Sequence, residues 1–204
     1  LNVALVGASG WRTRLLVRRW HSFLTMQARV AAQLNHIVTV SSASAADIAT
    51  DFGVLPSAIK VIPNGVDTEL FRALPDVIRK PAQLIATASA DAPLKGLAVL
   101  LQAFKILSTD RPTLQLILIA SPKPGGDTEA LIRQLALGDR IQFVGGASHA
   151  DIVRLYAEST VAVVPSLYEG FGLPAVEAMA SGIPLVSSDG GALAEVVGEG
   201  GLLV

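Results

Sequence analysis

The sequence predicts an α/β fold in which a parallel β-sheet is covered by helices on both faces. Beyond residue 80, short apolar runs alternate with helical stretches. The runs are apolar throughout rather than at every second position, which is typical of parallel strands buried on both faces. Hydrophobic residues make up 51% of the chain and charged residues 16%, so a sizeable core can form. In such sheets, ligands bind beyond the carboxyl ends of the strands.

The expected elements fall into two groups, separated by a stretch at 73–83 that contains two prolines and has little periodicity. We therefore expect an incomplete first domain at 1–75 and a second domain at 81–204. The first group comprises a strand at 36–41, a helix from about Ala43 to Phe52 and a strand at 59–63. The second group comprises strands at 84–89, 114–120, 140–145, 160–165 and 183–187, with helices near 95–108, 127–137, 148–158 and 174–181.

Composition excludes several kinds of site. The net charge of −1 does not favour nucleic acid as a partner. Cysteine is absent, which excludes disulfides and thiolate metal sites. The three histidines, His21, His36 and His149, have no metal-like spacing, so no metal site is expected. No apolar run is long enough to predict a membrane-spanning helix.

The charge is concentrated at the start, where residues 1–46 hold five arginines and no acid. All five arginines lie in a predicted helix at about 11–30, and four of them flank its apolar face: Arg12, Arg14, Arg18 and Arg19. One interpretation is a core-facing helix whose arginines extend to solvent. The other is a helix that lies on an anionic membrane surface, with Trp11, Trp20 and Phe23 interleaved.

The stretch "VALVGASG" at 3–10 resembles the entry to a dinucleotide-binding loop. The third glycine of that fingerprint is replaced by Thr13, and no acid follows about twenty residues later. A nicotinamide site is therefore not expected.

The stretch "YEGFGLPAVEAMASG" at 168–182 predicts a helix whose start is suited to an anion. Pro174 is placed at its first position, and neither Gly172 nor Leu173 can cap it with a side chain. Unpaired N–H groups at such a start bind phosphate. Glu169 precedes the helix and Glu177 lies one turn inside it, where a carboxylate can accept from a diol. The simpler alternative is a solvated Glu169 and a Glu177 that favours the helix dipole.

Lys95 lies in "ADAPLKG", which follows a predicted parallel strand and opens a helix. Its side chain is therefore expected at the same edge of the sheet, as a mobile charge suited to a diphosphate. The alternative is an ordinary solvated lysine.

With these residues in place, the chain resembles the family 4 glycosyltransferases over roughly residues 25–204. The motifs are "VIPNGVDTELF", "PLKGLAVLLQAFKIL" and "VVPSLYEGFGLPAVEAMASGIPLVSS", with two glutamates separated by seven residues. The resemblance implies the GT-B architecture of two Rossmann-like domains. It also implies sugar transfer from a nucleotide diphosphate-sugar, usually with retention and without a metal or other cofactor. Consistently, the sequence has no Asp-x-Asp pattern.

The resemblance assigns roles to individual residues. Glu169 would bind the donor sugar beside the reacting carbon, and Lys95 would stabilise the leaving diphosphate, so these two are the expected catalytic residues. Glu177 would bind the ribose. The remaining expected donor-binding residues are Gly170, Phe171, Gly172 and Leu173 through their backbone, Val144 and Gly145 beside the base in "FVGG", and Ser89, with "SPKPGG" at 121–126 nearby.

The chain departs from the family at three points. Ser89 stands where many members have a second diphosphate-binding arginine. Much of the first domain, with its usual active-site histidine, and the last helices are not in the sequence, so we expect a fragment. Acceptors in the family are often lipid-linked, which implies a cytoplasmic location with peripheral contact to the inner membrane face through 11–30.

Two other functions are compatible with the residues. A glycoside hydrolase also uses two carboxylates, about 5–9 Å apart, but needs neither Lys95 nor an uncapped helix start. A non-catalytic nucleotide-sugar-binding module would keep the donor site without the transfer.

Overall fold

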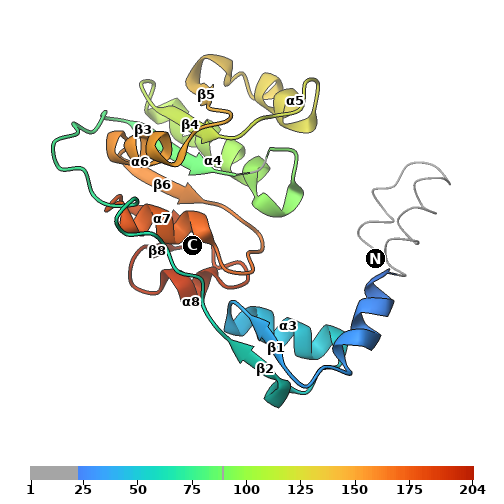
Figure 1. Ribbon diagram of the computed structural model, residues 1–204. Helices are drawn as coiled ribbons and strands as arrows, with labels where there is room; N and C mark the ends of the chain where they lie inside the picture. Colours follow the sequence, from blue (N-terminus) through green and yellow to red (C-terminus); the bar gives the residue numbers. More distant parts are fainter. Residues whose placement is uncertain (1–22, 89) are drawn as a thin grey trace. The chain divides into compact units, whose positions relative to one another are not determined.

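The computed structural model describes residues 23–88 and 90–204, and it has the predicted α/β fold (Figure 1). The chain divides into two compact units, Leu1–Pro63 and Asn64–Val204. The second unit is built on a six-stranded sheet, in which every pair of neighbouring strands is parallel. Its strands are β3 (Gln83–Thr87), β4 (Gln115–Ile119), β5 (Ile141–Phe143), β6 (Val161–Val164), β7 (Leu185–Ser187) and β8 (Leu202–Leu203).

The strand order, β5-β4-β3-β6-β7-β8, contains a reversal between β3 and β6. From β3 the chain adds strands in one direction, and from β6 it adds them in the other. In doubly wound sheets the crevice for a ligand lies at this reversal, beyond the carboxyl ends of the two strands. Two short elements at the end, β8 and the helix before it, are not among those expected from the sequence.

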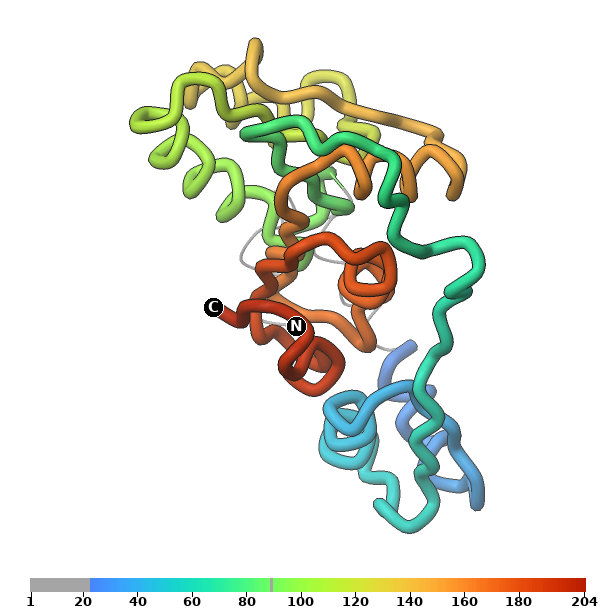
Figure 2. Tube along the Cα trace, turned by 90° about the vertical axis from the view of Figure 1, so that its left-hand side faces the viewer, coloured from blue at the N-terminus to red at the C-terminus, as the bar shows by residue number. Residues whose placement is uncertain are grey.

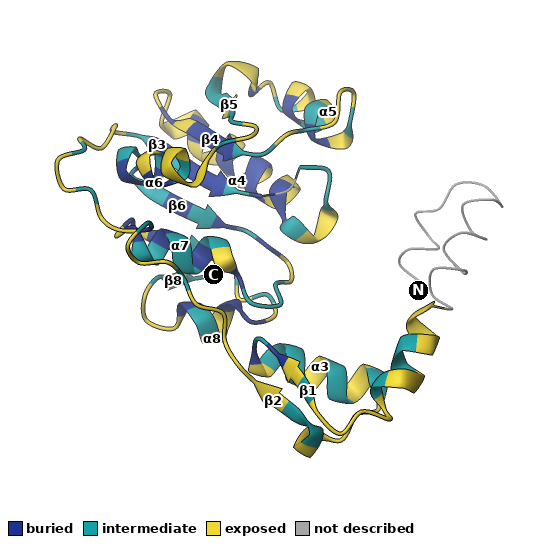
Figure 3. Ribbon diagram, viewed as in Figure 1, coloured by how far each residue is buried: buried dark blue, intermediate teal, exposed yellow. Residues whose placement is uncertain are grey.

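Helices cover both faces of this sheet, as predicted. Along β3, Ile85 packs into one hydrophobic cluster and Ala86 into the other, because successive side chains of a strand point to opposite faces. Phe104 belongs to the cluster on one face of the sheet, and Tyr156 belongs to the cluster on the other. Figure 3 shows the buried residues concentrated in the strands and the inner faces of the helices. The helices are α4 (Leu97–Asp110), α5 (Asp127–Gln134), α6 (His149–Glu158), α7 (Leu173–Ala180) and α8 (Leu193–Val197), with 3-10 turns η2 (Pro93–Lys95) and η3 (Gly138–Arg140).

The boundary between the units falls earlier than the expected end of the first domain at residue 75. The segment 64–80 contains no regular helix or strand (Figure 2) and belongs to the second unit. The reason is hydrophobic: Phe71 is 5% exposed and packs into the cluster that also contains Tyr156. Leu74, inside the predicted linker, packs against the same cluster, so the linker is partly fixed to the second unit.

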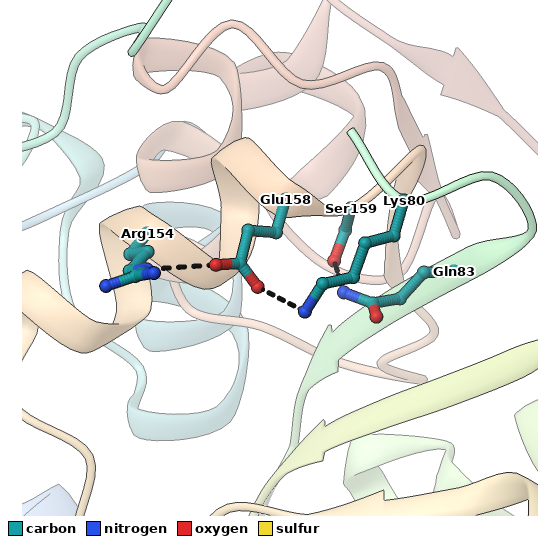
Figure 4. A network of polar contacts seen from close by, with 5 residues as sticks. All are labelled: Lys80, Gln83, Arg154, Glu158 and Ser159. Carbon is teal, nitrogen blue, oxygen red and sulfur yellow. Dashed lines mark hydrogen bonds and ion pairs between the residues drawn. The ribbon is translucent and has the colours of Figure 1, made fainter. Parts of the chain in front are cut away.

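Polar contacts fasten the end of this segment to α6 (Figure 4). The Lys80 backbone N–H donates to the carbonyl of Glu158 over 2.7 Å, and its Nζ lies 2.6 Å from Glu158 Oε2. Arg154 Nε reaches Glu158 Oε1 at 2.9 Å. These two cations hold the pKa of the Glu158 carboxyl below its usual range. Next to them, Gln83 Nε2 donates to Ser159 Oγ over 3.0 Å.

Within the first unit, the observed elements follow the predicted ones closely. Residues 23–31 are helical, and α3 begins where Ser41 Oγ accepts from the N–H of Ser44 over 3.0 Å. The arginine-rich part of the expected helix, 11–22, and the stretch 3–10 lie outside the described residues. None of the helices in the described ranges is long and apolar enough to cross a membrane. The named elements are β1 (Ile37–Thr39), α3 (Ser42–Phe52), η1 (Pro56–Ala58) and β2 (Ile59–Val61), with β1 and β2 parallel.

Candidate functional site

The structure brings Lys95 and Glu169 together at the reversal between β3 and β6. Lys95 ends η2, which follows β3, and Glu169 lies on the loop that follows β6. Lys95 Nζ and Glu169 Oε1 are 2.7 Å apart. The two side chains line a pocket of about 320 Å³, together with Thr87, Ala88, Ala90, Ile119, Ala120, Ser121 and Pro174.

The two loops meet because a glycine allows their backbones to touch. Gly96 has φ +64°, and a Cβ on it would lie 1.8 Å from the carbonyl oxygen of Pro165. Beside this contact, the Leu167 N–H donates to the Leu94 carbonyl over 2.9 Å. The Lys-Gly pair therefore places a cation at the crevice and a glycine where no side chain fits.

The backbone of Glu169 is also held from the other side, by the loop between β7 and α8. Its N–H donates to the carbonyl of Gly190 over 3.3 Å, and its carbonyl accepts from the N–H of Ala192 over 2.9 Å. Gly191 has φ +64°, and a Cβ there would lie 2.4 Å from the Glu169 carbonyl oxygen. These glycines are not among the residues expected at the site; the adjacent pair in "SDGG" is the local signal for such a close approach.

Helix α7 begins without a side-chain cap, as predicted. Its N-cap is Gly172, at φ +99°, and no side chain in the described ranges accepts a hydrogen bond from the first turn. In α6, by contrast, the side chains of Ser148 and Asp151 bond reciprocally to each other's backbone N–H. The expected backbone binders Gly170, Phe171, Gly172 and Leu173 lie at or just before the α7 start, within a few residues of Glu169. This end of α7 is therefore suited to an anionic ligand.

Glu177 lies one turn inside α7 and is not among the residues that line the pocket of Lys95 and Glu169. Burial raises the pKa of its carboxyl, and the nearby His149 partly opposes this. No hydrogen-bond partner of the Glu177 carboxylate is found among the described residues. A half-buried acid without a partner costs stability and is available to a ligand that brings hydroxyl groups.

The buried Tyr156 contacts two residues that line the pocket of Lys95 and Glu169, Thr87 and Pro174. The residue is 1% exposed, and its hydroxyl lies 3.3 Å from Thr87 Oγ1 and donates to the Pro174 carbonyl over 3.4 Å. Burial raises its pKa to about 12. It is a neutral support for two pocket-lining residues and not a proton donor at ordinary pH.

The segments expected to border the base lie side by side at the carboxyl ends of β4 and β5. The Val144 N–H donates to the Leu118 carbonyl over 2.8 Å, and a Cβ on Gly145 would lie 2.6 Å from Ser121 Oγ. Ser121 lines the pocket, so these predicted residues adjoin it. Ser89, also expected at the site, lies outside the described residues.

Asp91 is a second residue that the sequence analysis missed. Its carboxylate accepts from the N–H of Thr128 and of Lys123, each over 2.9 Å, and these bonds lower its pKa. It thereby caps the first turn of α5 and ties the loop after β3 to the loop after β4. The local signal was that α5 starts after Gly126, which has no side chain to cap it.

In the described part of the chain, no three or more His, Cys, Asp or Glu residues form a group that could hold a metal ion.

Comparison with known proteins identifies the family. Residues 75–204 match the family described as glycosyl transferases group 1, and residues 6–70 match glycosyltransferase family 4. The chain belongs to the group 1 glycosyl transferases. The resemblance to family 4 glycosyltransferases with GT-B architecture is thus confirmed, and the second domain is a Rossmann-like sheet.

Among proteins similar to this glycosyltransferase chain, the MMP alpha-(1->4)-mannosyltransferase of Mycolicibacterium hassiacum is 50% identical, over 96% of the chain and 47% of that protein. A D-inositol 3-phosphate glycosyltransferase of Acidothermus cellulolyticus is 32% identical, over 87% of the chain and 44% of that protein. The chain therefore spans about half the length of these relatives.

Solved structures agree with this assignment. Sucrose-phosphate synthase from Thermosynechococcus elongatus aligns with a TM-score of 0.74 at 26% identity, over 99% of this chain and 52% of that one. HepE from Anabaena, in complex with UDP and glucose, aligns with a TM-score of 0.73 at 26% identity, over 90% of this chain and 54% of that one.

Proposed function

We propose that the protein carrying this chain transfers a hexose, and specifically mannose, from a nucleotide diphosphate-sugar to a glycan, lipid or small-molecule acceptor. The observation that carries the proposal is the meeting of Lys95 and Glu169 beside the uncapped start of α7. A cation, a helix start without a side-chain cap and a carboxylate beside one crevice match the diphosphate and the hydroxyl groups of such a donor.

Each side chain has a role that follows from its position. Lys95 turns to the diphosphate and stabilises the charge that develops as the sugar leaves, an effect usually worth orders of magnitude in rate. Glu169 accepts from hydroxyls of the donor sugar. Glu177, whose carboxylate has no hydrogen-bond partner among the described residues, accepts from the ribose diol. Such charged hydrogen bonds contribute about 1.5–3 kcal/mol each.

Mannose is favoured because the relative at 50% identity is named a mannosyltransferase. A second relative, 39% identical over 54% of the chain, is the O-antigen chain mannosyltransferase B of Escherichia coli. Retention at the anomeric carbon and independence from metals remain part of the proposal, on the strength of the family resemblance. The acceptor side is also proposed: a lipid-linked acceptor, with the protein cytoplasmic and in peripheral contact with the inner membrane face.

The two other candidate functions fit less well. A glycoside hydrolase requires two carboxylates that flank one bond, whereas here Glu169 is ion-paired with Lys95 and Glu177 lies outside their pocket. A non-catalytic module that binds nucleotide-sugars shares the donor site, so only turnover separates it from a transferase.

Calorimetric titration of the chain with UDP, GDP and ADP tests the donor site and identifies the base. Product analysis of the protein that carries the chain, with nucleotide-linked mannose and glucose, with and without EDTA, then tests transfer. NMR of the product gives the anomeric configuration. If the chain binds none of the three nucleotides, the proposal is overturned. If it binds a nucleotide but transfers sugar to no acceptor, the non-catalytic module is favoured.

A further inference from the structure

We propose that Ser166 is a positioning residue, which keeps the Glu169 carboxylate aimed at the donor sugar when Lys95 turns away to the diphosphate. The inference rests on the proposed function, because it gives Glu169 and Lys95 separate parts of one donor. It concerns how Glu169 is held during donor binding, a role that the family motifs assign to no residue.

Both partners of Glu169 use the same carboxylate oxygen. Ser166 Oγ donates to Glu169 Oε1 over 2.8 Å, and Lys95 Nζ lies 2.7 Å from that atom. Oε2 has no hydrogen-bond partner from the described side chains. The side chain of Glu169 is only 11% exposed, so the carboxylate has little freedom and presents one oxygen to the crevice.

The two partners differ in mobility. The Lys95 side chain is 34% exposed and has four rotatable bonds, so it can turn from Glu169 to a phosphate, which then becomes its anionic partner. Ser166 is 3% exposed and directly follows Pro165 at the end of β6. Its short side chain cannot follow the lysine.

Ser166 is itself fixed by the neighbouring strand. Ser188, just after β7, donates from its hydroxyl to the Ser166 carbonyl, and its N–H donates to the Val164 carbonyl over 3.0 Å. A rigid donor held from a second element is the arrangement by which supporting hydrogen bonds orient a functional carboxylate. Once Lys95 has moved, Ser166 is the remaining described side chain that holds Glu169.

Without the Ser166 hydroxyl, the carboxylate is held by Lys95 alone and loses its orientation as the lysine engages the diphosphate. Binding of a free nucleoside diphosphate does not use Glu169 and is unaffected. Binding of the sugar-linked form falls by about tenfold, as expected for one hydrogen bond to a charged group.

The test is calorimetry on the protein that carries the chain, with GDP against GDP-mannose and UDP against UDP-glucose as probe pairs. The variants are Ser166→Ala, Glu169→Ala and the double substitution. Ser166→Ala is expected to weaken only the sugar-linked ligand, and to have no further effect once Glu169 is alanine. Ser166→Thr, which keeps the hydroxyl, is expected to restore the sugar preference. An effect that persists in the Glu169→Ala background would overturn the proposal, because Ser166 would then act through packing.

Ser181→Ala is the matched control. Ser181 is also 3% exposed, but its hydroxyl has no hydrogen-bond partner among the described residues, so its loss should change neither affinity. If Ser166→Ala does not fold, Ser166→Cys keeps the volume with a poor donor and should show the same selective loss; parent-like binding would then overturn the inference. A Glu169→Ala variant that binds the sugar-linked ligand normally overturns the proposed function itself. If Glu169→Ala selectively weakens binding of the sugar-linked ligand while Ser166→Ala binds it like the parent, only the inference about Ser166 is overturned.

Discussion

A Cβ on Gly96 would lie 1.8 Å from the carbonyl oxygen of Pro165, so the loop of Lys95 and the loop of Glu169 touch backbone to backbone. The contact fixes the distance between the two charged side chains, and it leaves no room for a side chain. Any residue other than glycine at position 96 must push the loops apart.

Gly96→Ala is therefore expected to lower the free energy of unfolding by about 1–3 kcal/mol through overpacking, in addition to the strain of a positive φ. Urea unfolding measures the loss. Gly125→Ala is the matched control, because Gly125 has φ +69° with nothing within 4 Å of an added Cβ. Equal losses in the two variants would show that the loops yield to the added methyl group.

Lys95→Ala is expected to weaken binding of the nucleoside diphosphate by about tenfold or more at low salt, because a charge-assisted contact is lost. The difference from the parent should shrink as salt rises, since screening weakens the attraction in both. Titrations at low and high ionic strength measure this. Lys105→Ala, an exposed lysine of α4, is the control and should bind like the parent. Parent-like affinity of Lys95→Ala at low salt would mean that Lys95 does not face the diphosphate.

Nucleotide binding is expected to weaken on mild acidification through Glu177. Burial raises the pKa of this carboxyl, so it takes up a proton at a higher pH than an ordinary glutamate, and the protonated form accepts poorly from the ribose. Tyr156, with a pKa of about 12, stays neutral throughout, whereas a charged His149 opposes the shift. Affinity measured as a function of pH should fall more steeply through the raised pKa in the parent than in Glu177→Gln, because protonation of the nucleotide's own phosphate, at about pH 6, affects both alike.

The same group sets a pH dependence of stability with a defined sign. Its folded pKa lies above the unfolded one, so the folded state holds the proton more tightly, and the contribution of Glu177 to the free energy of unfolding is lost as pH rises through the raised pKa. Urea unfolding at pH values below and above the raised pKa measures this contribution, and it should be absent from Glu177→Gln. A decline of unchanged size in the variant would assign it to another group.

Contact with an anionic membrane through residues 11–30 remains a prediction. In the described part of this stretch, the helix at 23–31 exposes Phe23, Leu24 and Met26. The protein should sediment with phosphatidylserine vesicles at low salt. It should stay in the supernatant at high salt or with neutral vesicles. Absence from the pellet under all conditions would leave the alternative, a helix packed on protein with its arginines extended to solvent.

The sequence by itself determined the strands and helices of the second domain up to β7, the uncapped start of α7, and the placing of Lys95 and Glu169 after strands; α8 and β8 were not expected from it. These features depend on local rules: apolar periodicity, the fixed φ of Pro174 and the missing side chain of Gly172. Such features can be predicted from the residues within one or two turns of each position. The family motifs add the role of each residue, because they occur together at fixed spacings.

Only the tertiary structure decided which of these loops meet. Lys95 and Glu169 are 74 positions apart, and Asp91 and Thr128 are 37 apart, so their contacts follow from the strand order β4-β3-β6 and not from local pattern. The same holds for Ser166, whose carbonyl accepts from the hydroxyl of Ser188 just after the neighbouring strand β7, and for Phe71, which packs into the core of the second unit. Periodicity tells which side of an element is buried, whereas the partner on that side is set by the free energy of the whole packed sheet.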